Sequence, residues 1–409
     1  VYRVRSEGGR GMVVMLGSIL GLARSRGHKQ AYIASRVLVY SGFLTGFVGI
    51  YMGIVRLACY ELGCPFPSIA AHADLLLNTA LPLVIMGVGS LLGPAYYAYP
   101  PHGSVMIAIS ALGVLYTIIS LLASFVGGFF EARVNYALLS LVSLLFLTSN
   151  LDLYVKRRTK GFLGLMNIPF TLSSLLITIY SLSMLTGLAI RAPPWFPLVV
   201  FVIPMIFSVM LRTDPYTRKW YRENLSWIIF TVSMIAISSG FVSVVSVFMD
   251  SKALLRIALA LITVAIAMLG ILLIPRKSGS KILREYEVSI KLSIPWGLVG
   301  LLAGFITIPG SMDFLTHTLA LGFVGNIFMA YSRFLLPYRP FTPGMMRALT
   351  LPVIVTINIG ILLRTLYGLL IYQPLEGIWI VVLGALSLLS SIIMGSVLAL
   401  VVIRILSAI

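Results

Sequence analysis

Long apolar runs separated by short polar gaps make up most of the chain. A bilayer core of about 30 Å requires roughly 20 apolar residues per helix. Runs of this kind lie near 34–57, 68–92, 104–128, 134–154, 164–190, 195–212, 226–249, 253–275, 292–309, 313–337, 347–371 and 378–406. The pattern predicts an all-α, polytopic membrane protein with about twelve helices in one bundle. The bundle is expected over 34–409, after a basic N-terminal arm over 1–33.

Composition supports this prediction. The 409 residues are 59% hydrophobic and 10% charged, with a mean hydropathy of +1.03. A soluble domain of this length would not stay in solution with that balance. The polar gaps are too short to hold a soluble domain. We therefore expect a multi-pass protein of the cell membrane, with the lipid bilayer as its main surroundings.

The net charge of +18 would by itself favour a nucleic-acid partner. An N-terminus in the cytoplasm, however, places most of the basic residues on one side of the membrane. This is the positive-inside bias of membrane proteins, so both termini are expected in the cytoplasm and nucleic acid is not expected as a partner. The basic residues concerned lie in the arm, in the loops at 156–160, 212–222 and 276–291, and at Arg333, Arg339, Arg347 and Arg404.

The two cysteines, Cys59 and Cys64, fall in the outer loop between the first two predicted spans. A disulfide at this place is compatible with an oxidising outer face, and two free thiols are the alternative.

Two of the four histidines fall inside predicted spans. His72 and His317 lie about five residues from the outer ends of the second and tenth spans, whereas His28 and His102 fall in basic or loop segments and are expected to be solvated. At 1.5 Å rise per residue, His72 and His317 should lie at similar depth in the outer third of the bilayer. An ionisable residue within the membrane indicates a functional site. The alternative is a neutral imidazole bonded to a neighbouring helix.

Two histidines at one depth can hold a metal ion or a haem between them. A bare zinc or copper ion prefers three or four ligands, and Asp74 and Asp313 are the further candidates nearby. A haem requires only two axial ligands and a large apolar slot. The pair of histidines therefore favours a haem over a bare metal ion.

Four other residues are candidates for the surroundings of this haem. Gly322 and Gly325 would let the macrocycle approach the tenth span, although glycines in membrane helices also serve close packing. Asp313 precedes His317 by four residues and so shares its helical face. Arg364 would meet a haem propionate, or else form an ion pair with Asp74 or Asp313.

Two segments carry a resemblance to known families. "HADLLLNTALPLVIMG" (72–87) is similar to small proteins related to subunit I of the haem–copper oxidases, and "HTLALGFVGNIFMAYSRFLLP" (317–337) is similar to NnrS-type haem and copper membrane proteins. The twelve-helix pattern with histidines on helices 2 and 10 also resembles subunit I of haem–copper oxidases and nitric-oxide reductases. In those proteins the two positions carry the ligands of the low-spin haem. The resemblance therefore implies that His72 and His317 bind one haem b as a bis-histidine, low-spin centre.

The chain departs from these families at the catalytic centre. Oxidases place copper ligands on helices 6 and 7, but 195–212 and 226–249 contain no histidine, and the second helix-10 histidine is replaced by Leu315. The resemblance therefore implies electron transfer, or redox or nitric-oxide-related sensing, without a binuclear centre. Expected partners are a quinol and an outer-face redox protein of a respiratory chain.

Two other classes of function remain open from the sequence. One is a secondary transporter, because polar residues within spans and prolines that interrupt helices occur in that class. The other is a cofactor-free structural subunit of a larger membrane complex. The residues that favour a transporter are Asp74, Asp152, Arg364, Pro82, Pro169, Pro204 and Pro352.

Overall fold

The computed structural model describes residues 26–62, 69–126, 129–189, 192–213, 226–273, 281–306, 309–335, 351–372 and 377–406. Every regular element within these stretches is helical. The elements are α2 (Arg26–Leu62), α3 (Ile69–Ala73), η1 (Asp74–Ala80), α4 (Leu81–Tyr97), α5 (Gly103–Val126), α6 (Phe129–Val155), α7 (Gly161–Leu165), α8 (Asn167–Leu185), η2 (Leu198–Val202), α9 (Ile203–Thr213), α11 (Ser226–Phe248), α12 (Lys252–Leu273), α13 (Lys281–Gly304), α14 (Ser311–His317), η3 (Thr318–Gly325), α15 (Asn326–Leu335), α17 (Leu351–Leu370) and α18 (Ile378–Leu406).

Ten helical segments in the described residues are long and apolar enough to cross a membrane, and each coincides with a predicted span. Shorter apolar helices at Leu198–Leu211 and Val381–Val397 occupy the predicted sixth and twelfth spans. Many large apolar side chains along these helices are exposed, as expected where lipid is the solvent. The all-α, multi-pass character predicted from the sequence is confirmed.

The chain forms two compact units, each built from separated segments. Unit 1 takes its residues from 1–46, 74–192 and 199–258, and unit 2 from 47–73, 193–198 and 259–409. Helix α2 contributes its first part to unit 1 and its second part to unit 2. Most of the predicted basic arm lies outside the described residues. Cys64 also lies outside them, as does the side chain of Cys59.

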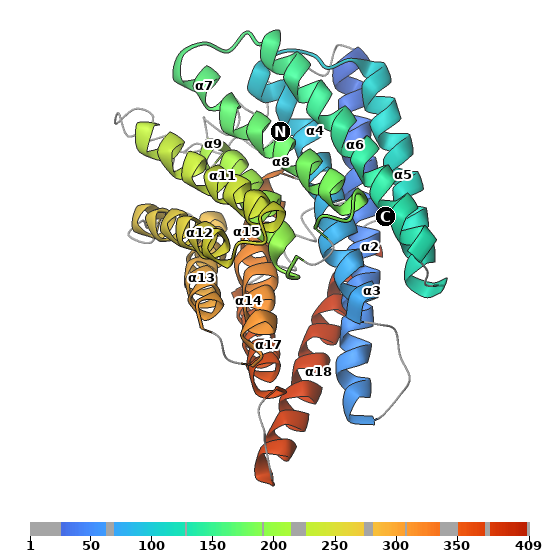
Figure 1. The fold of residues 1–409 in the computed structure, drawn as a ribbon, viewed down its shortest axis with the longest axis vertical. Coiled ribbons are helices and arrows are strands. Elements are labelled where there is room, and N and C mark those ends of the chain that lie inside the picture. The colour runs from blue at the N-terminus through green and yellow to red at the C-terminus, as the bar shows by residue number, and fades with distance from the viewer. Residues whose placement is uncertain are drawn as a thin grey trace. The chain divides into compact units, whose positions relative to one another are not determined.

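Unit 1 contains helices α4, α5, α6, α8 and α11, drawn from light blue to yellow-green (Figure 1). Hydroxyl pairs join its helices: Ser143 of α6 lies 2.8 Å from Ser181 of α8, and Ser173 of α8 lies 2.9 Å from Ser208 of α9. Lipid tails are as apolar as the helix surfaces, so the hydrophobic effect does not drive helices together within a membrane. Interhelical hydrogen bonds of this kind therefore contribute to their association.

Unit 2 contains helices α13, α14, α15, α17 and α18, drawn in orange and red (Figure 1). Helix α14 packs against both α13 and α17. At the other side of the unit, Ser387 of α18 donates a hydrogen bond to the carbonyl oxygen of Leu57 on α2 at 2.7 Å. Ser390 likewise reaches the carbonyl oxygen of Gly360 on α17 at 3.3 Å. These bonds connect the second part of α2 to α17 through α18.

Three of the helices contain π-helical segments, which are rare and are frequently found at functional sites. Segment η1 follows His72 by one residue, and η3 begins directly after His317. Segment η2 opens α9. These segments fall in the second, sixth and tenth predicted spans, so a π-helix recurs every fourth span in the described part of the chain.

Candidate functional site

The imidazole of His72 packs against helix α2 within unit 2. Its Nδ1 lies 2.7 Å from the carbonyl oxygen of Gly49. The ring also covers the backbone of Gly53, where an added Cβ would lie 2.7 Å from Nδ1. A side chain at position 53 would therefore occupy the space of the ring. The carbonyl can only accept, so Nδ1 carries the proton in this hydrogen bond.

The imidazole of His317 is held from its own helix. Its Nδ1 lies 2.9 Å from the carbonyl oxygen of Asp313, one turn earlier on α14. The Oδ1 atom of the same aspartate lies 3.3 Å from Nδ1. Both acceptors assign the proton to Nδ1, as in the ring of His72.

The two histidines share a further property: among the described residues, the Nε2 atom of neither ring has a hydrogen-bond partner. In metal sites, a ligating histidine typically donates one ring N–H to a carbonyl or carboxylate and binds the metal through the other nitrogen. His72, His317, Asp313 and Arg364 also lie close enough to interact electrostatically. All four residues belong to unit 2.

Arg364 of α17 forms a two-point ion pair with Asp313. Its Nη1 donates to Oδ2 at 2.9 Å, and its Nη2 donates to Oδ1 at 3.3 Å. The side chains are 20% and 24% exposed, respectively. Of the alternatives left by the sequence, the structure therefore places Arg364 against Asp313. Asp74 belongs to unit 1 and contacts other residues.

The two candidate glycines of η3 differ in their surroundings. A Cβ at Gly322 would lie 2.6 Å from the Trp296 side chain of α13, so this glycine accommodates an indole ring. The space expected for a macrocycle beside Gly322 is thus filled by protein. Gly325 has only the carbonyl oxygen of Ala320 near its position, at 3.6 Å. Of the two, Gly325 is the one that leaves an open face.

A buried amide network lies beyond η3 and was not singled out from the sequence. Asn326 of α15 and Asn358 of α17 donate to each other's side-chain oxygen at 3.0 Å in both directions. Trp296 donates its indole N–H to Asn358 at 2.8 Å. One asparagine in each of two predicted spans is the sequence signal that points to such a pair, but neither spacing nor composition identifies the partner.

Unit 1 has its own polar cluster around Asp74. Asn78 donates to the carboxylate at 2.5 Å, and the hydroxyl of Tyr136 donates to it at 3.3 Å. The hydroxyls of Tyr180 and Tyr116 donate to the side-chain and backbone oxygens of Asn78. This arrangement joins η1 to α5, α6 and α8. It satisfies a carboxylate that would otherwise be expensive within the membrane.

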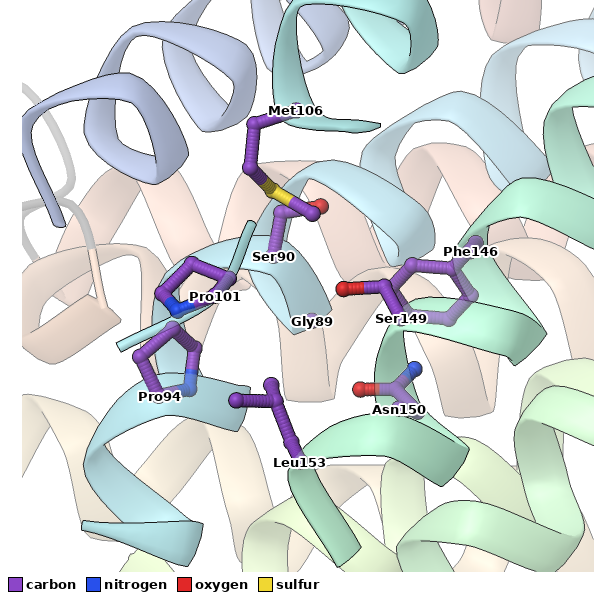
Figure 2. A pocket seen from close by; sticks show the side chains of 9 residues that line it. All are labelled: Gly89, Ser90, Pro94, Pro101, Met106, Phe146, Ser149, Asn150 and Leu153. Carbon is purple, nitrogen blue, oxygen red and sulfur yellow. The ribbon is translucent and has the colours of Figure 1, made fainter. Parts of the chain in front are cut away.

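A small pocket also lies in unit 1, between α4, α5 and α6 (Figure 2). Its lining combines apolar side chains with the hydroxyls of Ser90 and Ser149 and the amide of Asn150, and Ser149 extends from α6 toward α4 at Gly89 (Figure 2). The empty space is about 180 Å³. That space includes open solvent, and essentially none of it holds a water-sized sphere, so the pocket is too small for a small-molecule site. The pocket does not match a macrocycle.

The transporter candidate Asp152 lies at the end of α6. Lys156 approaches its Oδ1 atom at 2.6 Å, and Nε2 of His102 lies 3.5 Å from its Oδ2 atom. The hydrogen bond to Asp152 raises the pKa of the Lys156 ammonium. His102 is exposed, as its loop position predicted, whereas His28 is half-buried at the start of α2, contrary to the prediction that it is solvated. The three groups form a solvated ion-pair cluster at a helix end.

Comparison with known proteins adds no family assignment. No family model matches the sequence, and no curated protein matches it significantly.

The two histidines of unit 2 have the donor chemistry that the axial positions of a haem require. The donor set consists of two imidazole Nε2 atoms, each on a ring whose other nitrogen is already hydrogen-bonded. Two neutral nitrogen ligands match a low-spin haem. Gly325 leaves an open face on η3, and η3 carries no charged side chain.

Proposed function

We propose that the chain is a haem-b-binding membrane protein in which His72 and His317 hold the iron through their Nε2 atoms. The observation that carries the proposal is that both imidazole rings use Nδ1 for a hydrogen bond to a backbone carbonyl. Each donates its Nδ1–H to a backbone carbonyl, at 2.7 and 2.9 Å, and so leaves Nε2 as the ring nitrogen whose lone pair can bind a metal. Neither Nε2 atom belongs to the fully buried polar atoms that lack a partner among the described residues, so each ring keeps one nitrogen that a ligand can reach.

The chain's own residues would fix the orientation of both ligands. On α2, the carbonyl of Gly49 accepts the hydrogen bond of the His72 ring and Gly53 leaves space for it. On α14, Asp313 orients the His317 ring. Because both Nδ1–H bonds are made before any ligand binds, the rings do not need to change tautomer on binding. Arg364 keeps the Asp313 carboxylate paired within the membrane.

A haem b held by two imidazoles supplies one-electron redox chemistry and leaves no open coordination position. The proposed role is therefore electron transfer or redox sensing, related to the low-spin haem site of haem–copper oxidase subunit I and of NnrS-type proteins. A quinol in the bilayer and a redox protein at the outer face are the proposed partners, within a respiratory chain or a larger membrane complex. The proposed topology has twelve spans in the cell membrane with both termini in the cytoplasm.

A visible spectrum tests the proposal directly. The protein is expressed with sufficient haem, purified in mild detergent and measured oxidised and dithionite-reduced, with a pyridine haemochrome assay for stoichiometry. We expect sharp reduced α and β bands and about one haem b per chain, the stoichiometry of a bis-histidine centre. His72→Ala and His317→Ala should each abolish or convert the low-spin bands. His28→Ala and His102→Ala are the matched controls and should leave the bands unchanged.

A secondary transporter is the second candidate, and the Asp74 cluster favours it. A carboxylate bonded to Asn78 and Tyr136 at a π-helical segment is an arrangement in which an ion or polar solute can be bound within a membrane. A featureless visible spectrum from the wild-type protein would remove the haem proposal and leave this candidate and the structural subunit.

A further inference from the structure

The two proposed ligands differ in the electrostatic character of their Nδ1 partners. The Nδ1–H of His72 meets the neutral carbonyl of Gly49. The Nδ1–H of His317 meets a carbonyl and, at 3.3 Å, the Asp313 carboxylate. A carboxylate acceptor increases the basicity of the imidazole and strengthens its donation to a metal. The Asp313 carboxylate therefore acts most directly on the His317 ligand, through its Nδ1–H.

Arg364 opposes this effect of the carboxylate. Its guanidinium engages both oxygens of Asp313, including the Oδ1 atom that approaches His317. Charges interact more strongly in the low dielectric of a membrane protein interior than in water, so this pairing reduces the negative potential that reaches the imidazole. Asp313 thus contacts both His317 on its own helix, α14, and Arg364 on α17.

Glycines make room for the ion pair. A Cβ at Gly368, one turn beyond Arg364 on α17, would overlap with Oδ2 of Asp313 and lie 2.9 Å from Nη1 of Arg364. A Cβ added at Gly310, where φ is +85°, would lie 2.7 and 2.9 Å from the carbonyl oxygens of Gly368 and Leu369. Both the approach of Asp313 and the turn before α14 thus depend on positions without a side chain.

We propose that Arg364 is a positioning residue that raises the reduction potential of the centre by acting on His317 through Asp313. The inference rests on the haem site proposed above. Without the guanidinium, the full carboxylate charge would act on the Nδ1–H, favour the more basic ligand and stabilise the oxidised state. Without the carboxylate, the ligand would donate less, the guanidinium charge would stand alone, and the reduced state would be favoured.

Redox potentiometry of the purified, haem-loaded full chain tests the inference, with the reduced α band as the signal. Arg364→Gln should lower the midpoint potential, and Asp313→Asn should raise it. The double variant should lie between the two. Gly368→Ala changes no charge but displaces the carboxylate from the guanidinium, and should also shift the potential. The atoms nearest to a Cβ added at Gly360, on the same helix, belong to the side chains of Ile393 and Met394, at 3.0 Å, so Gly360→Ala is the matched control.

A merely structural role would give a different result. It would convert part of the haem to a high-spin form, or shift both single variants in the same direction. Either result, or an unchanged potential in Arg364→Gln, would overturn the inference while the wild-type low-spin spectrum still supports the haem site. A wild-type protein without haem would overturn the proposed function and this inference together. Arg364→Lys keeps the charge without the two-point contact, and should lower the potential less than Arg364→Gln.

Discussion

Gly53 provides the space that the ring of His72 occupies: an added Cβ would lie 2.7 Å from Nδ1 and 3.2 Å from Nε2. Gly53→Ala should therefore displace the imidazole from its bond to Gly49. Overpacking of this kind typically costs about 1–3 kcal/mol. We expect a lower Tm and, in the haem-loaded protein, loss or conversion of the low-spin bands.

Gly46→Ala is the control for this change. It lies on the same helix, and its new Cβ would meet only the Cβ of Ala80 at an ordinary 3.5 Å. Equal loss of low-spin haem in both variants would show that the helix, and not the His72 ring, is sensitive to substitution.

Removing Arg364 should destabilise the protein even before haem is considered. Arg364→Met leaves the Asp313 carboxylate without its counter-charge in a membrane helix. We expect the free energy of unfolding to fall by about 3 kcal/mol. This is the lower end of the range for breaking a buried ion pair, because both side chains keep some exposure. The measurement is the thermal unfolding of the apoprotein in detergent.

The double variant Asp313→Asn/Arg364→Met should recover most of that loss, since no charge is then left unpaired. Arg256→Met removes an arginine from an exposed position of α12 and should change the Tm little. No recovery in the double variant would mean that Arg364 stabilises α17 through other contacts.

The amide network of α13, α15 and α17 should contribute to stability independently. Asn358→Leu removes the acceptor of Trp296 and both bonds to Asn326. Each buried polar group left unsatisfied costs about 1–3 kcal/mol. Thr356→Val, on the exposed face of the same helix, removes only a hydroxyl bonded to Pro352 of its own helix and should be close to neutral. Equal Tm values for the two variants would contradict a stabilising role for the network.

Cysteine labelling should reveal the orientation of the chain. On a Cys59→Ser/Cys64→Ser background, Lys252→Cys at the first residue of α12 should react with a membrane-impermeant maleimide in intact cells. Lys160→Cys, in the basic segment after α6, should react only after permeabilisation. Both positions are exposed, so access to reagent is decided by the side of the membrane. The reverse pattern would place both termini outside.

The fold class was predictable because length and hydropathy determine which segments can cross a bilayer. All ten long apolar helices lie where the apolar runs predicted them. The division into two units was not predictable, because it depends on which helices contact each other. The boundary within α2 near Gly46 has no signal in hydropathy, which continues without change through this position.

The candidate site was predictable in part. The four-residue spacing of Asp313 and His317 predicted a shared face, and the structure places Nδ1 of the histidine 3.3 Å from the carboxylate. The partners of His72 were missed, although Gly42, Gly46, Gly49 and Gly53 form a small-residue series of the kind that permits close approach. Gly322 was identified as a small residue, but only the structure shows that Trp296 fills the space beside it.

The π-helical segment η3 determines which side chains of α15 face the neighbouring helices. A π-helix uses more residues per turn than an α-helix, so Thr318–Gly325 rotates α15 away from the phase that α14 would have set. Asn326 faces Asn358 in this rotated phase. Deleting one residue within η3 would leave the apolar run almost as long and as hydrophobic as before. The deletion would nevertheless turn Asn326 away from Asn358, because it changes the rotation of α15 about the helix axis. Hydropathy does not record this rotation.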